Sequence, residues 1–114
     1  MNPVVTTNRQ ETIEQLIDKV KHYAPRADIG QIGRAYEVAK SAHAGQFRKS
    51  GEPYIMHPLA AAHILADMRI DPVIVSAILL HDVPEDTSFT IEQIEAEFGS
   101  DIAGLIRGLT KLGR

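Results

Sequence analysis

The stretch that decides the fold is DPVIVSAILL, residues 71–80, which carries no charged residue after its first aspartate. Asp71 followed by Pro72 is typical of a helix start, because aspartate caps free N–H groups and proline has none to satisfy at the first position. A buried parallel strand would show the same unbroken apolar run. We favour a helix, because the Asp-Pro start agrees with the surrounding helical pattern and no alternating strand signal is present.

Apolar residues recur every three or four positions on both sides of this run, which is the spacing of amphipathic helices. Further helix starts are expected at Thr7 with Gln10, Asp28 with Gln31, Pro58, Thr90 with Gln93, and Ser100. Together these signals predict one all-α domain, a bundle of about six helices whose last member is cut short by the end of the chain.

Composition narrows the classes of function. The chain has 114 residues, of which 44% are apolar, and its net charge is −3. That is enough apolar material for one buried core, and the mild acidity counts against a nucleic-acid partner. The absence of cysteine excludes disulfides and thiolate metal sites. No apolar run approaches the ~20 residues that span a bilayer. We therefore expect a soluble, cytoplasmic protein without a membrane partner.

The candidate chemistry follows the apolar run directly, in HDVPED, residues 81–86. Asp82, Glu85 and Asp86 repel one another, and at a helix C-terminus the helix dipole disfavours each negative charge by ~0.3–1 kcal/mol. A divalent cation held by His81 and Asp82 would remove this conflict. The alternative is that His81 is a core histidine and the acids form a solvated surface. The residues alone leave both interpretations open.

A second histidine, His57, stands 24 residues before His81, at the expected start of a helix. If that helix and residues 71–80 form an antiparallel hairpin, the start of the first lies beside the end of the second. His57 would then approach His81 and Asp82. Mixed imidazole and carboxylate ligands suit Mn, Zn or Fe rather than Ca.

The loop before His57, RKSGEPYIMHP, begins with two basic residues, Arg48 and Lys49. A planar guanidinium and a point charge can recognise a phosphate or the face of a base. The alternative is a solvated basic loop. Next to a carboxylate-rich metal centre, these cations favour an anionic, phosphorylated substrate.

The remaining histidines are expected to have other roles. His43 shares a helical stripe with Tyr36 and Ala39, so we expect a buried, hydrogen-bonded packing residue. His63 lies on a helix that is apolar nearly all round, and the same expectation applies. His22 is expected at the surface.

Three longer runs carry a family resemblance: AHAGQFRKSGEPYIMHPLAAAHILADM, DPVIVSAILLHDVPEDTSFTIEQIEAEFG and GLTKL. From about Ile32 to Leu112 the chain resembles the N-terminal hydrolase domain of RelA/SpoT-type alarmone enzymes, a branch of the HD superfamily of metal-dependent phosphohydrolases. The resemblance implies an all-α, Mn-binding domain. It also implies hydrolysis of the 3′-pyrophosphate of the stringent-response alarmone (p)ppGpp, a guanine nucleotide.

The resemblance further implies roles for individual residues. The implied metal ligands are His57, His81 and Asp82. The implied catalytic acids, which orient or activate the attacking water, are Glu85 and Asp86. The implied guanine-binding residues are Arg48, Lys49 and Ser50.

Two departures from the family pattern affect these expectations. Pro84 stands inside the HDVPED motif, where it predicts a break or kink at Val83. The family's remaining metal-binding aspartate lies beyond the end of this chain, which stops 32 residues after Asp82. We therefore expect residues 1–114 to be the N-terminal part of an HD phosphohydrolase domain, with impaired or no activity.

Other functions stay open for the same reasons. One alternative is a non-catalytic helical domain that binds a nucleotide or a protein partner. Another is an HD phosphohydrolase for a different nucleotide. An apolar stripe on the last helix, left uncovered, would favour self-association; its residues are Ile102, Leu105, Ile106 and Leu109.

Overall fold

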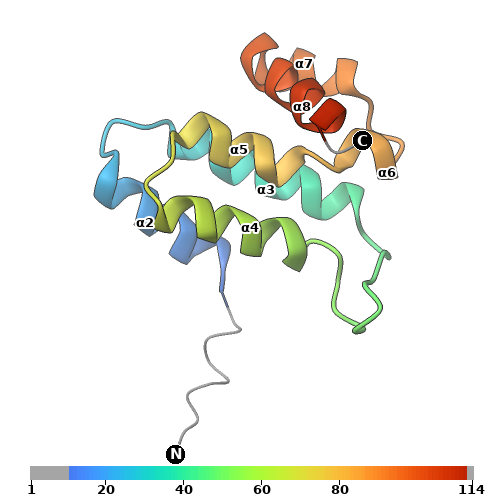
Figure 1. Ribbon diagram of the computed structural model, residues 1–114. Helices are drawn as coiled ribbons and strands as arrows, with labels where there is room; N and C mark the ends of the chain where they lie inside the picture. The colour runs from blue at the N-terminus through green and yellow to red at the C-terminus, as the bar shows by residue number, and fades with distance from the viewer. Residues whose placement is uncertain (1–10, 113–114) are drawn as a thin grey trace, which may run out of the picture.

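The computed structural model describes residues 11–112, and side chains as far as residue 110, and its regular elements are all helices (Figure 1). They are α2 (Ile13–Tyr23), α3 (Ile29–Ala42), α4 (Met56–Asp67), α5 (Pro72–Leu80), α6 (Val83–Asp86), α7 (Ile91–Phe98) and α8 (Ser100–Leu112). Because α6 is a single turn of four residues, the described part contains six longer helices. The predicted all-α class is confirmed. None of the described helices combines the length and apolarity needed to cross a membrane.

The apolar run that decided the prediction does form a helix, α5. The Asp71 carboxylate accepts a hydrogen bond from the Val73 N–H at 2.9 Å, and Pro72 occupies the first helical position. At the start of α7, Thr90 and Gln93 form the expected capping box. These local signals operate as predicted because a cap satisfies N–H groups that the first turn leaves free.

Two helix starts differ from the prediction. The capping box of α2 is formed by Thr12 and Gln15, whereas the expected box at Thr7 and Gln10 lies outside the described residues. Helix α4 begins at Met56, so Pro58 is its third residue and not its first. Proline is tolerated there because the first four N–H groups of a helix have no partner within the helix.

Helix α5 lies at the centre of the fold, in contact with α3, α4 and α8. This explains its lack of charge, since Leu79 and Leu80 at its end are completely buried. Burying each leucine contributes ~1.5–3 kcal/mol. Helices α4 and α5 form the predicted antiparallel hairpin, so the start of α4 and the end of α5 lie at the same end of the molecule (Figure 1).

The apolar stripe of α8 is covered, contrary to the expectation. Ile102 and Ile106 are each 1% exposed, and α8 packs against α5 and α7. Leu105 and Leu109 are half-buried. The stripe is covered because the α7–α8 pair folds back over α5 (Figure 1). Self-association through this stripe therefore loses its physical basis.

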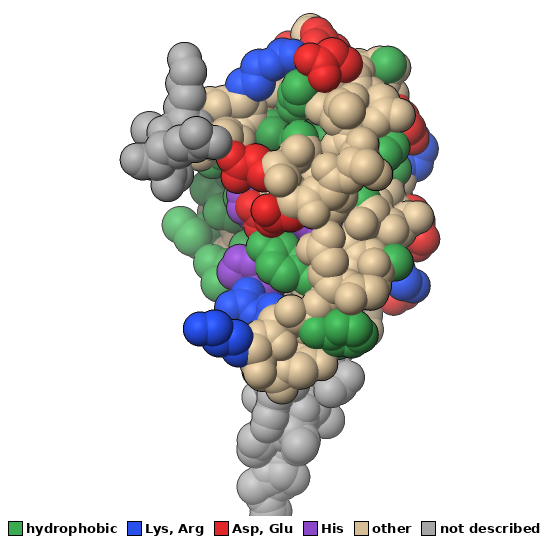
Figure 2. Space-filling model, turned by 90° about the vertical axis from the view of Figure 1, so that its right-hand side faces the viewer, with side chains coloured by type: hydrophobic (Ala, Val, Ile, Leu, Met, Phe, Trp, Pro, Cys, Tyr) green, Lys and Arg blue, Asp and Glu red, His purple; other side chains and the backbone are tan. Residues whose placement is uncertain are grey.

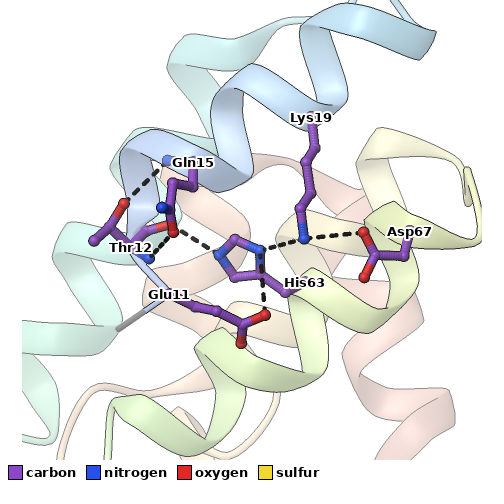
Figure 3. A network of polar contacts seen from close by, with 6 residues as sticks. All are labelled: Glu11, Thr12, Gln15, Lys19, His63 and Asp67. Carbon is purple, nitrogen blue, oxygen red and sulfur yellow. Dashed lines mark hydrogen bonds and ion pairs between the residues drawn. The ribbon is translucent and has the colours of Figure 1, made fainter. Parts of the chain in front are cut away.

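Polar contacts around a buried histidine join α2 to α4 (Figure 3). His63 is 1% exposed, and its Nε2 lies 2.9 Å from the Thr12 carbonyl oxygen. A carbonyl oxygen only accepts, so Nε2 carries the proton and Nδ1 accepts from the Lys19 ammonium at 2.9 Å. Lys19 also forms a 2.9 Å ion pair with Asp67. The predicted burial of His63 is confirmed.

Candidate functional site

The predicted site residues all lie at one end of the α4–α5 hairpin. They come from the loop of residues 43–55, the start of α4, the end of α5, and α6 (Figure 1). Figure 2 shows this side of the molecule, where histidine side chains lie between acidic side chains above and basic side chains below. The fold therefore places side chains of both charges around imidazole groups.

The pair at the end of α5 is the best-defined part of this site. His81 Nδ1 lies 2.7 Å from the Ile78 carbonyl oxygen, so this nitrogen carries a proton. His81 Nε2 lies 3.2 Å from Asp82 Oδ1. In a neutral ring, Nε2 therefore presents its lone pair to the space that the carboxylate also faces. A histidine and a carboxylate that bind one cation are arranged in this way, with the other ring nitrogen of the histidine donating to a carbonyl oxygen.

The other oxygen of Asp82 is held by a tyrosine that sequence reasoning did not single out. The Tyr54 hydroxyl donates to Asp82 Oδ2 at 2.5 Å. Burial of the phenol raises the pKa of Tyr54 well above its ordinary value; the hydrogen bond to Asp82 raises it further, and the Arg48 charge opposes this. Tyr54 therefore remains a hydrogen-bond donor. The signal that could have identified Tyr54 was its place in the RKSGEPYIMHP run, three residues before His57. A tyrosine hydroxyl that becomes partly buried beside a site needs a hydrogen-bond partner there.

His57 occupies the second position of α4 and is exposed. Its ring contacts the Tyr54 ring edge-on, with 5.7 Å between centroids. Partial burial lowers the pKa of His57 and Arg48 lowers it further, while Asp82 raises it and His81 adds a smaller lowering. The ring is thereby favoured in the neutral form that binds metals.

The described residues do not, however, form a complete metal centre. Within residues 11–112, no three histidine, aspartate or glutamate side chains lie close enough to hold one ion together. His81 and Asp82 provide two adjacent donors, and Tyr54 contacts both Asp82 and His57. The imidazole and carboxylate groups are thus of the kind that bind a divalent cation, but only His81 and Asp82 lie close enough together to share one.

The break near Pro84 is present but lies earlier than predicted. Helix α5 ends at Leu80, before His81 and Asp82, and Pro84 falls in the first turn of α6. Proline needs no N–H partner in a first turn, so it starts a new helix and does not kink an old one. Val83, the expected position of the break, is instead the buried first residue of α6.

The two remaining acids of the motif lie on α6. Glu85 and Asp86 are exposed and lie in the single turn of this helix, of which Asp86 is the last residue. They follow the C-terminus of α5 as expected, but on a separate short helix. The turn is closed by a 3.0 Å bond from the Asp86 N–H to the Asp82 carbonyl. The Asp86 carbonyl accepts from Gln46 Nε2 at 3.1 Å.

The basic residues lie at the tip of the loop. Arg48, Lys49 and Ser50 are exposed, and the tip is closed by bonds from the Arg48 N–H to the Glu52 carbonyl at 2.9 Å and from the Gly51 N–H to the Arg48 carbonyl at 2.8 Å. Gly51 has φ +94, a left-handed conformation that favours glycine. The loop thus presents two cations to solvent beside His57.

Comparison with known proteins gives a consistent result. Residues 35–114 match the family model described as HD domain. A Vibrio cholerae protein named guanosine-3′,5′-bis(diphosphate) 3′-pyrophosphohydrolase is 46% identical over 89% of the chain and 14% of its own length. The bifunctional (p)ppGpp synthase/hydrolase SpoT of Escherichia coli is 47% identical over 91% of the chain and 14% of its own length. A probable GTP pyrophosphokinase of Mycobacterium leprae is 46% identical over 90% of the chain, and here the chain spans 13% of the relative.

Proposed function

This chain belongs to the HD domain family and is homologous to the N-terminal region of RelA/SpoT-type (p)ppGpp synthase/hydrolases, and from that membership we propose that it forms part of a (p)ppGpp 3′-pyrophosphohydrolase. One structural observation carries the proposal. His81 Nε2 and Asp82 Oδ1 lie 3.2 Å apart, with the opposite nitrogen of His81 held by a carbonyl oxygen. This pair is suited to bind a divalent cation.

We propose that His57, His81 and Asp82 hold Mn²⁺. The pKa of His57 is lowered, which favours the neutral ring that can bind a metal. Imidazole and carboxylate ligands suit Mn²⁺ and would also accept Zn²⁺ or Fe²⁺. When bound, such a cation polarises a phosphoryl oxygen and lowers the pKa of a coordinated water.

The remaining side chains would act on the water and on the nucleotide. Glu85 and Asp86 are exposed beside Asp82, and their carboxylates are proposed to orient the attacking water and accept its proton. Arg48, Lys49 and Ser50 are proposed to hold the guanine nucleotide at the loop tip. The water oxygen would form a bond to the phosphorus attached to the ribose 3′-oxygen, and the bond between that phosphorus and the 3′-oxygen would break. Pyrophosphate would leave, and the 3′-oxygen would take up a proton.

The proposal is tested by Mn²⁺ titration calorimetry and by (p)ppGpp binding and hydrolysis, comparing the parent with Asp82→Asn and Arg48→Ala. Asp82→Asn is expected to weaken Mn²⁺ binding at least tenfold, because it removes a charged ligand of the adjacent pair. Arg48→Ala should leave Mn²⁺ affinity unchanged and weaken nucleotide binding about tenfold or more, as expected for loss of a charged hydrogen bond. Lys21→Ala, an exposed cation on α2, is the matched control.

The outcome that would overturn the proposal is a parent protein that binds neither Mn²⁺ nor the nucleotide. A second function has one observation in its favour, since the described residues hold no complete three-ligand group. The protein would then be a non-catalytic guanine-nucleotide-binding domain. Tight nucleotide binding that is indifferent to Mn²⁺ and to Asp82→Asn would select this second function.

A further inference from the structure

Two loop side chains hold the two ends of the segment from Asp82 to Asp86. The Tyr54 hydroxyl donates to Asp82 Oδ2 at 2.5 Å, and Gln46 Nε2 donates to the Asp86 carbonyl at 3.1 Å. Both donors come from the loop of residues 43–55, which is distant from this segment in sequence. The acidic turn is therefore anchored to the loop at both of its ends.

The two donors are connected to each other through a buried histidine. The Asp86 carbonyl only accepts, so the amide nitrogen of Gln46 must face it and Oε1 must face His43 Nδ1, 3.1 Å away. His43 therefore carries its proton on Nδ1. Its ring is 2% exposed and lies 4.6 Å, centroid to centroid, from the Tyr54 ring. The predicted burial and hydrogen bonding of His43 are thus confirmed, and its contacts give it a function beyond packing.

A backbone bond completes this unit, from the Tyr54 N–H to the Gln46 carbonyl at 2.9 Å. We call the unit formed by His43, Gln46 and Tyr54 the loop brace. Each member contacts the next, so the position of the tyrosine hydroxyl depends on the whole unit. Close packing around the buried His43 restricts the movement of its ring, and the Tyr54 ring packs against it.

We propose that the loop brace is a positioning device for the acidic segment, with Tyr54 as the positioning residue for Asp82. Tyr54 occupies Oδ2 and so fixes the rotation of the carboxylate, which leaves Oδ1 facing His81 Nε2 at 3.2 Å. Gln46 fixes the far end of α6. The inference rests on the proposed function, because Tyr54 acts through Asp82 and touches no reacting group. Outer hydrogen bonds of this kind typically change metal affinity 10–100-fold.

The chain supplies a matched control in Tyr23. Its hydroxyl donates to the Ile70 carbonyl at 2.6 Å, and burial raises its pKa as it does for Tyr54. Ile70 lies in the turn between α4 and α5, at the end of the hairpin opposite the site. Tyr23→Phe therefore removes a similar hydrogen bond without touching the acidic segment.

The experiment compares Tyr54→Phe and Tyr23→Phe with the parent by two measurements. Amide hydrogen exchange in the metal-free protein reports on the Asp86 and Thr87 N–H groups, which close α6. We expect Tyr54→Phe to speed their exchange about tenfold and Tyr23→Phe to leave it within twofold, because a single turn exchanges by local opening. Gln46→Met should speed the same two amides.

The second measurement is a calorimetric titration with Mn²⁺ alone. We expect Tyr54→Phe to bind Mn²⁺ about tenfold more weakly than the parent, and Tyr23→Phe to bind it as tightly as the parent. Unchanged exchange at Asp86 and Thr87 in Tyr54→Phe would overturn the loop brace, whatever the metal result. Unchanged Mn²⁺ affinity in that variant, with a parent that binds, would overturn the role toward Asp82. A parent that binds no Mn²⁺ would contradict the proposed function, and the exchange measurement would then decide the loop brace by itself.

Discussion

Replacing Lys19 with methionine should measure how much the contacts around His63 stabilise the fold. Lys19 donates to the buried Nδ1 of His63 at 2.9 Å and pairs with Asp67 at the same distance (Figure 3). Methionine keeps most of the apolar stem and its packing but removes the donor. The change therefore leaves a buried acceptor without its ammonium partner.

The expected loss combines two contributions. An unsatisfied buried acceptor costs ~1–3 kcal/mol. The ion pair with Asp67 adds less than ~1 kcal/mol, because Asp67 is 61% exposed and exposed pairs contribute little. We expect Lys19→Met to lower the free energy of unfolding by about 1–4 kcal/mol. Asp67→Asn, which removes only the ion pair, should lower it by less than ~1 kcal/mol.

Urea unfolding followed by circular dichroism provides the measurement, completed by a double-mutant cycle with His63→Leu. Removing both partners should cost less than the sum of the single changes by at least ~1 kcal/mol, since no buried acceptor is then left unpaired. The Thr12 carbonyl keeps a partner in the Leu16 N–H at 3.1 Å. A Lys19→Met protein within ~0.5 kcal/mol of the parent would refute the reasoning, because the loss of the ammonium partner would then cost His63 almost nothing.

Two further predictions concern positions away from the site. Arg69 has φ +58 in the turn between α4 and α5, a conformation that costs an L-residue ~1–2 kcal/mol. Arg69→Gly should therefore raise the melting temperature by a few degrees, even after glycine's entropic cost of ~0.5–1 kcal/mol. A lower melting temperature would contradict this prediction. The Ser76 hydroxyl is fully buried on α5 without a hydrogen-bond partner in the described structure. Ser76→Ala should therefore leave the free energy of unfolding unchanged or raise it by up to ~1 kcal/mol, as measured by urea unfolding. A loss above ~1 kcal/mol would show that the hydroxyl does have a partner.

The helices could be predicted because their signals are local. Asp71 and Pro72 start α5, and Thr90 with Gln93 starts α7, through contacts within three residues of the chain. The start of α4 was missed because proline is acceptable anywhere in a first turn, so Pro58 could not distinguish the first position from the third. Local chemistry thus determined which segments are helical more reliably than where each begins.

The site was predicted only in part, for a related reason. The adjacency of His81 and Asp82 in sequence made their pairing foreseeable, and the hairpin brought His57 to the same end. The contact of Tyr54 with Asp82 spans 28 residues, and that of Gln46 with Asp86 spans 40. Contacts of this range depend on how the loop packs against α5 and α6, which no local pattern encodes.

The amino-acid sequence by itself determined the all-α class, the central helix α5 and the identity of the acidic and basic residues at its end, because capping and apolar periodicity act within a few residues. Only the tertiary structure decided that α5 and α7 cover the apolar stripe of α8, that α6 begins before Pro84, and that a tyrosine from the loop holds Asp82. Those outcomes depend on burial and on hydrogen bonds between distant segments, which exist only once the helices have packed together.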